Sequence, residues 1–130
     1  MSLTAIGQIR ELLVPAVVSD DRCWRRSDLP DDAEMPFLTL SEISTTPRLQ
    51  GDSSTIMSVT ELVQVDVWQS VWFVDLTLLD RTIAALNSKK LNGDHLRVTV
   101  QDAARVPEEG VVHDAITVRV ARLIPSAVAI

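Results

Sequence analysis

Alternating valines between residues 59 and 67 constrain the fold more than any other feature of this sequence. Val63, Val65 and Val67 occupy every second position, with Gln64 and Asp66 between them. Side chains of a strand point alternately to its two faces, so the pattern predicts a β-strand with one apolar and one polar face. The chain must therefore build a sheet and cover one side of it.

Other segments supply the cover and the remaining strands. An amphipathic helix is expected over residues 3–17, and a second helix is expected to begin at an Asp75 cap with Trp72, Leu76, Leu79, Ile83 and Leu86 on its apolar stripe. Further strands are predicted at residues 22–26, 36–45, 96–100 and 116–120, the last two forming a hairpin. These elements predict one α+β domain over residues 1–130, with two helices packed on one face of a mainly antiparallel sheet of four to five strands.

Three segments fall outside these elements. Residues 46–55 contain Pro47 and Gly51 and few large hydrophobic side chains, so we expect a mobile loop there. Residues 27–34 read as an acidic loop, and residues 123–130 form an apolar C-terminal tail without a charged side chain.

Composition excludes several classes of function. The 130 residues include 18 acidic and 12 basic side chains, a balance opposite to that of a protein that coats DNA. The 4 glycines are scattered, which excludes a glycine-rich phosphate loop, and the single cysteine excludes an internal disulfide and a cysteine zinc site. Neither a signal peptide nor a membrane span is recognisable, so synthesis in a reducing, soluble compartment is expected.

No constellation of reactive residues predicts an enzyme. His95 and His113 stand beside Asp94 and Asp114, but their spacing is not that of a metal site, and we interpret both histidines as strand-end residues. Cys23 is interpreted as a partly buried strand residue, although arginines at positions 22, 25 and 26 offer a way to lower its pKa. The paired carboxylates at 20–21, 31–32 and 108–109 lie in loop-like sequence and are expected to be solvated. We therefore expect no catalytic residue, no cofactor and no bound metal.

Surplus apolar side chains indicate a contact with another subunit or partner. Trp72 and Phe73 lie in a connection between strand and helix, and Trp68 lies on the polar face of its strand. Cover by the same chain, such as a helix over Trp68, is the alternative. The candidate subunit or partner contacts are Arg48, Leu49, Trp68, Trp72, Phe73, Leu123 and Ile124.

The order of these segments resembles a known family. The segments come in a fixed order. It begins with a proline-led strand at residues 36–43, a breaker loop and the strand ending Val65-Asp66-Val67-Trp68, and it continues with an amphipathic helix ending at Leu86 and a hairpin with a closing strand. This order is similar to that of the tail terminator, or tail-to-head joining, proteins of long-tailed bacteriophages, over roughly residues 36–122. The acidic segment at 27–34 and the apolar tail have no counterpart in the resemblance.

The resemblance implies a structural virion protein without a cofactor. Such a protein forms a ring, typically a hexamer, at the head-proximal end of the tail after assembly in the host cytoplasm. The ring caps the tail tube, stops its polymerisation and offers a surface to the head–tail connector, with tail tube protein, connector and further copies as partners. It implies neither a membrane nor sequence-specific nucleic acid as a partner. An acidic ring suits DNA that slides through it, because a lysine-lined ring would bind the DNA.

Two other classes of function stay open from the sequence. One is a small oligomeric ligand-binding or regulatory α+β domain of ferredoxin-like type, which requires a pocket with convergent polar groups. The other is a small hydrolase using Cys23 or the histidines, for which the sequence has no nucleophile elbow.

Overall fold

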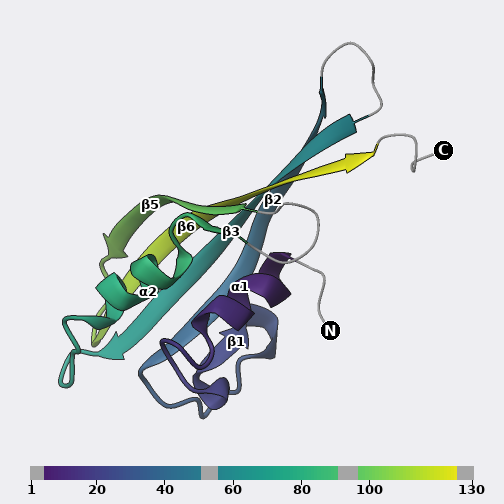
Figure 1. Ribbon diagram of the computed structural model, residues 1–130. Helices are drawn as coiled ribbons and strands as arrows, with labels where there is room; N and C mark the ends of the chain where they lie inside the picture. Colours follow the sequence, from purple (N-terminus) through teal and green to yellow (C-terminus); the bar gives the residue numbers. More distant parts are fainter. Residues whose placement is uncertain (1–4, 51–55, 91–96, 126–130) are drawn as a thin grey trace.

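The computed structural model describes residues 5–50, 56–90 and 97–125; for 46–50, 56–58, 90 and 122–125 it describes the backbone alone. These residues form two α-helices, two short 3-10 helices and six strands (Figure 1). In chain order they are α1 (Ala5–Leu13), η1 (Asp20–Arg22), β1 (Cys23–Arg25), η2 (Arg26–Asp28), β2 (Phe37–Gln50), β3 (Ile56–Ser70), α2 (Leu78–Leu86), β4 (Lys89–Lys90), β5 (Arg97–Val106) and β6 (Val111–Pro125).

The α+β class is confirmed, and the sheet differs from the expected one. Its six strands within the described residues follow the order β1-β2-β3-β6-β5-β4. The sheet is mixed, because β1 runs parallel to β2 whereas the other neighbouring strands run antiparallel. The expectation of a mainly antiparallel sheet fails at β1 because a strand of three residues carries no signal for its direction. The short strand β4 is not predicted from the sequence, because Lys89 and Lys90 are also suited to the C-terminal end of a helix.

The alternating valines lie where the sequence predicts them. Val63, Val65 and Val67 are fully buried, and Val65 pairs with Leu40 of β2 on one side and with Ile116 of β6 on the other. Three neighbouring strands thus contribute apolar side chains from alternate positions to the same core. Two of these strands, β3 and β6, are the central strands of the sheet.

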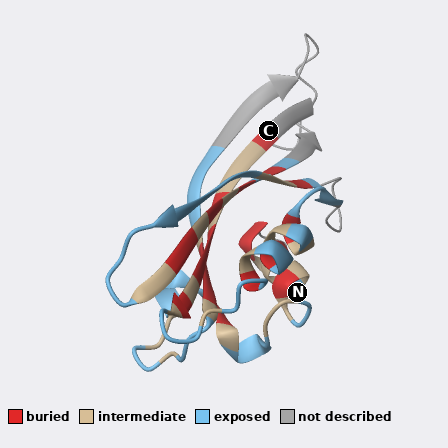
Figure 2. Cartoon of the chain, turned by 90° about the vertical axis from the view of Figure 1, so that its left-hand side faces the viewer, coloured by how far each residue is buried: buried red, intermediate tan, exposed pale blue. Residues whose placement is uncertain are grey.

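The two helices complete this core. Ile9 and Leu13 of α1 and Leu78 and Leu86 of α2 belong to one buried cluster with the alternate strand residues, and the helices contact each other. Figure 1 draws both helices in front of the sheet, and Figure 2, turned by 90°, shows the buried residues where helices and strands meet. Beyond its bulge, β5 is exposed.

The second helix begins later than the sequence predicts. It starts at Leu78, and Trp72 and Leu76, expected on its apolar stripe, precede it and are exposed. The backbone N–H of Thr77 donates to the Asp75 carboxylate, which places a turn before the first helical residue. The buried positions of α2 are therefore Leu78, Thr82 and Leu86.

The expectation of a loop over residues 46–55 is wrong for residues 46–50. Residues 46–50 continue β2 and pair with β3, so Pro47 lies inside a strand, while residues 51–55 are outside the described part. A strand tolerates proline at an edge, and β1 pairs only with residues 38–40 of β2. The expected apolar tail divides similarly: 123–125 end β6, and 126–130 lie outside the described residues.

Three strands run past the helices and form an extension of the domain. At its far end the register aligns Leu49 with Met57 and Met57 with Ile124, so β2, β3 and β6 stay paired beyond the core (Figure 1). We call residues 46–50, 56–60 and 121–125 the strand extension.

Candidate assembly surface

The connection between β3 and α2 exposes an unusual concentration of large hydrophobic side chains. Val71 is 50% exposed, Trp72 83%, and Phe73 and Leu76 84% each. We call residues 71–76 the apolar loop. A cluster of large side chains that its own chain leaves uncovered is typical of a contact surface.

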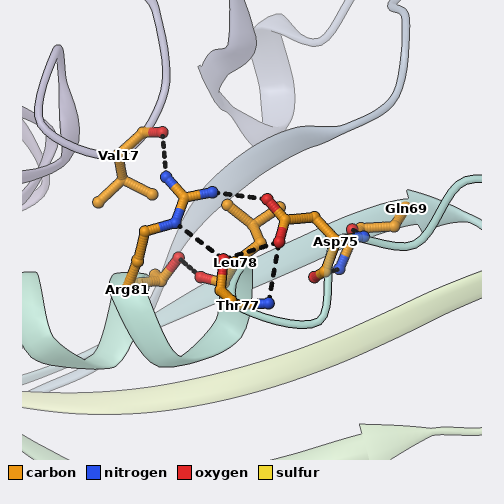
Figure 3. Close-up of polar contacts among 7 residues, drawn as sticks. Val17, Gln69, Asp75, Thr77, Leu78 and Arg81 are labelled. Atoms are coloured by element: carbon orange, nitrogen blue, oxygen red, sulfur yellow. Dashed lines mark hydrogen bonds and ion pairs between the residues drawn. The ribbon is translucent and has the colours of Figure 1, made fainter.

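A buried glutamine holds the base of this loop. Gln69 is 2% exposed; its side-chain oxygen accepts the backbone N–H of Asp75 at 2.7 Å, and its amide donates to the Asp75 carbonyl at 3.4 Å (Figure 3). On the β3 side, the backbone N–H of Phe73 donates to the Ser70 carbonyl at 3.1 Å. Both ends of the loop are therefore tied to the end of β3.

The Asp75 carboxylate joins the loop to α2. It accepts the backbone N–H and the hydroxyl of Thr77 at 2.9 and 2.7 Å, and the Arg81 guanidinium at 2.7 Å. The hydrogen bonds from Thr77, followed by those from Arg81, hold the pKa of Asp75 below its usual value. Arg81 also donates to the Val17 carbonyl at 3.4 Å (Figure 3). This network connects the end of the loop to α2, while Trp72 and Phe73 remain exposed.

Trp68 contacts residues of the two neighbouring strands, β2 and β6. Its ring is half-buried and stacks on the His113 ring, with 3.7 Å between the two ring centroids. The centroid of the Phe37 ring lies 6.3 Å from that of Trp68. The indole N–H donates to the Thr39 hydroxyl at 3.0 Å. The alternative weighed for Trp68, cover by its own chain, holds in part, and the cover described here comes from residues of neighbouring strands and not from a helix.

His113 lies near the start of β6, as expected, but its burial and its two carboxyl neighbours are not predicted from the sequence. The residue is 7% exposed; its Nε2 lies 2.6 Å from Asp66 Oδ1 and its Nδ1 lies 2.6 Å from Glu108 Oε2. Both hydrogen bonds form together only when the ring carries two protons or one carboxyl group is protonated. The Gln64 amide also donates to Asp66 Oδ1, at 2.8 Å.

Sequence reasoning misses this group because its members are far apart in the chain. The one hint in the sequence that Asp66 belongs to a buried group is its place in the strand. It stands between Val65 and Val67 and shares a strand face with Trp68. Only the register, which pairs Trp68 with His113, shows which partner crosses the sheet. Asp114, weighed as a metal ligand, instead accepts from Arg105 at 3.0 Å, and Asp94 and His95 lie outside the described residues.

A small apolar cavity lies beside the aromatic pair Phe37 and Trp68. Its volume is about 180 Å³, and Arg26, Leu29 and Thr39 complete its lining. A larger, more open depression of about 470 Å³ lies along the β1 edge, lined by Ile6, Arg25, Arg26, Ser27, Leu40, Ser41 and Glu42.

The predicted contact residues fall into two groups. Trp72 and Phe73 lie on the apolar loop at one end of β3, with Trp68 on the strand behind them. Arg48 and Leu49 pair with Ser58 and Met57 of β3, which pair in turn with Leu123 and Ile124 of β6. The backbone register thus brings these four predicted residues to one level of the strand extension.

Cys23 is buried and does not have an activated thiol. It is 1% exposed, and burial raises the pKa of its thiol to about 11, while the charge of Arg10 acts in the lowering direction. The arginines at positions 22, 25 and 26 therefore do not produce the lowered pKa considered from the sequence.

The Cys23 thiol is expected to react slowly with DTNB in the folded protein. At pH 8 the thiolate fraction at a pKa of about 11 is about 100-fold below that at the ordinary value of 9.0, and burial adds a steric barrier. The absorbance of released thionitrobenzoate, followed in buffer and in urea, measures this ratio, with Cys23→Ser as the blank. Equal rates in the two solvents would contradict the prediction.

Two classes of site are absent from the described part of the chain. Among residues 5–50, 56–90 and 97–125, no group of three or more His, Cys, Asp or Glu side chains is arranged to hold a metal ion. Neither described helix has the length and hydropathy needed to cross a membrane.

Comparison with known proteins establishes a structural likeness. No protein-family model and no curated protein sequence matches the chain. A solved structure, "Virion of native gene transfer agent (GTA) particle", contains a chain that is similar over 94% of this protein and 89% of that chain, with 14% identity and a TM-score of 0.57. At this identity the likeness shows a shared fold.

Proposed function

We propose that the protein is a structural component of a phage-like virion and acts there as a tail terminator. In this role it forms a ring, typically a hexamer, which caps the tail tube, stops its polymerisation and provides the surface that joins the head. The observation that carries the proposal is the fold shared with a chain of a gene transfer agent virion over 94% of this protein. The order of segments that resembles phage tail terminators supports the same role independently.

The distribution of candidate contact surfaces agrees with assembly into a ring. The apolar loop and the strand extension lie at opposite ends of the 15-residue strand β3. A subunit of a ring meets its two neighbours through two different patches, and closure depends on the rotation between subunits. Two separate patches on one subunit provide the contacts that such a ring and its docking partners need.

Charge and chemistry favour a structural role over an enzymatic one. The net charge of −6 suits a ring through which DNA passes without being held. The proposed partners are further copies of the chain, the tail tube protein and the head–tail connector, at the head-proximal end of the tail. The role requires neither a cofactor nor a catalytic residue.

Mass measurement and imaging test the proposal together. Native mass spectrometry at tens of micromolar, with and without tail tube protein, is expected to show a closed oligomer, with the tube promoting assembly where the free interface is small. Negative-stain images should place the ring at one end of assembled tails. A strict monomer in both conditions, or rings that never bind tube ends, would contradict the proposed function.

A further inference from the structure

We propose that one proton, shared by His113, Asp66 and Glu108, clamps the turn between β5 and β6 onto the sheet, and that the turn opens when a rise in pH removes this proton. We call the three side chains the proton cluster and residues 107–110 the clamp turn. The clamp is independent of the proposed function, because it consists of contacts within one chain.

The distances in the proton cluster require a proton that a neutral histidine does not supply. His113 Nε2 lies 2.6 Å from Asp66 Oδ1, and His113 Nδ1 lies 2.6 Å from Glu108 Oε2. A neutral imidazole has one N–H, so its other nitrogen would present a lone pair to an ionised carboxylate. Two acceptors at this distance repel each other, whereas one additional proton turns the same contact into a hydrogen bond. The cluster therefore holds one proton more than a neutral ring and two carboxylates.

The position of this proton follows from the other partner of Asp66. The Gln64 amide donates to Asp66 Oδ1 at 2.8 Å, so this oxygen is an acceptor and the N–H that faces it belongs to His113 Nε2. The additional proton then lies between His113 Nδ1 and Glu108 Oε2. This is the end of the cluster nearer to water, because the Glu108 side chain is 39% exposed and Asp66 is fully buried.

Loss of the proton acts on the clamp turn, because Glu108 is the member of the cluster that can move. The register of β3 and β6 fixes Asp66 and His113, while Glu108 lies on the turn and can rotate into solvent. The Gly110 carbonyl of the same turn accepts the Val71 N–H at 3.4 Å. Opening of the turn therefore also removes a hydrogen bond from the start of the apolar loop.

The charged groups around the cluster leave its two carboxyl groups to the histidine. Arg105 of β5 pairs with Asp114 at 3.0 Å, and Arg26 of η2 lines the aromatic cavity. Within the described residues, the ion pairs of Asp66 and Glu108 are those with His113. The other neighbours in hydrogen bonds, ring contacts or strand register are uncharged; they are Gln64, Trp68, Thr39 and Val106.

The proton makes the stability of the fold depend on pH. In the unfolded chain both carboxyl groups are ionised, and a histidine loses its proton above about pH 6.5. Above that pH the folded chain binds one proton more than the unfolded chain, so stability falls as the pH rises. The stabilisation by the proton is therefore complete below about pH 6.5 and declines above it, until the proton leaves and the turn opens.

Glu108→Gln tests the proton while it keeps a hydrogen-bonding side chain at the same position. A glutamine amide donates to Nδ1 of a neutral ring, so this variant needs no additional proton. Urea titrations at pH 7 and pH 8 measure the unfolding equilibrium constant of each protein. Divided by that of Glu108→Gln, the constant of the unmodified chain is expected to rise about tenfold over this interval, the effect of one proton. Groups that titrate elsewhere in the chain cancel in this ratio.

Glu109→Gln is the matched control, because Glu109 is an exposed carboxylate on the same turn. It should retain the pH dependence of the unmodified chain. Hydrogen exchange of the Val71 amide measures the turn itself. Between pH 7 and pH 9 the protection factor of this amide should fall in the unmodified chain and in Glu109→Gln, and it should stay constant in Glu108→Gln.

Each result supports or overturns a stated part of the clamp. The same pH dependence of stability in all three proteins would overturn the shared proton, and a constant protection factor of Val71 in the unmodified chain would overturn the opening of the turn. If Glu108→Gln does not fold, NMR of the labelled unmodified chain at pH 7.5 decides. A proton on His113 Nδ1 or on Glu108 supports the clamp, whereas a neutral ring without a proton on Nδ1 beside an ionised Glu108 overturns it. None of these measurements tests ring formation, so the proposed function stands or fails separately.

Discussion

Val65→Asp is expected to leave the protein unfolded in dilute buffer at 25 °C. Val65 is fully buried on the central strand β3, between Leu40 of β2 and Ile116 of β6. A carboxylate there has no cationic partner among the core residues, and burying an unpaired charge belongs to the small class of substitutions that cost more than about 4–5 kcal/mol. Far-ultraviolet circular dichroism and urea titration measure the loss.

The same substitution on the apolar loop provides the control. Val71 is 50% exposed, so Val71→Asp is expected to change the free energy of unfolding by no more than about 0.5 kcal/mol. If Val65→Asp shows a cooperative urea transition close to that of Val71→Asp, the assignment of Val65 to the core is wrong.

The second large effect is expected at the buried histidine. His113→Ala should lower the free energy of unfolding by about 1–3 kcal/mol, the usual cost of leaving a buried hydrogen-bonding group without its partner. The substitution removes the ring from Asp66, a fully buried residue whose second carboxyl oxygen, Oδ2, already has no hydrogen-bond partner in the described part of the chain. It also removes the surface on which Trp68 stacks.

A double variant identifies the origin of this loss. In the His113→Ala background, Asp66→Asn changes a carboxyl group that has already lost its hydrogen-bond partner, so it should cost less stability than Asp66→Asn in the unmodified chain. The coupling free energy between the two positions, from urea titration of all four proteins, measures the interaction. Glu109→Ala, an exposed carboxylate beside Glu108, should change stability little. Additive effects of the Asp66 and His113 substitutions would contradict the pairing.

The parts of the fold that sequence predicts are those with strong local periodicity. The valines of β3 and the Ile9 and Leu13 positions of α1 follow the repeat of their element, and all are buried. The strand around Pro47 is not predicted because proline usually interrupts a strand. Proline is tolerated here because β1 pairs with residues 38–40 of β2 and does not extend beside Pro47. Edge position is a property of the assembled sheet that no local pattern encodes.

The candidate surface is predictable in part for a similar reason. Trp72 and Phe73 stand out because no periodic element accommodates them, and they are exposed. Trp68 looks surplus in the sequence because its stacking partner His113 is distant in the chain and joins it only through the register of β3 and β6. The cavity is not predictable, since Leu29 and Phe37 line it from segments that carry no shared motif.

The strand order has a consequence for how the chain folds as it is synthesised. β6 is the last described strand, yet it lies between β3 and β5, and its register with β3 joins residues as far apart as Ile56 and Pro125. Until β6 leaves the ribosome, one long edge of β3 stays without its partner, and the core lacks Ile116, Val118 and Val120. Contacts this distant in sequence slow folding, and an open strand edge invites pairing with other nascent chains. The core is therefore completed only after the final described strand has been synthesised.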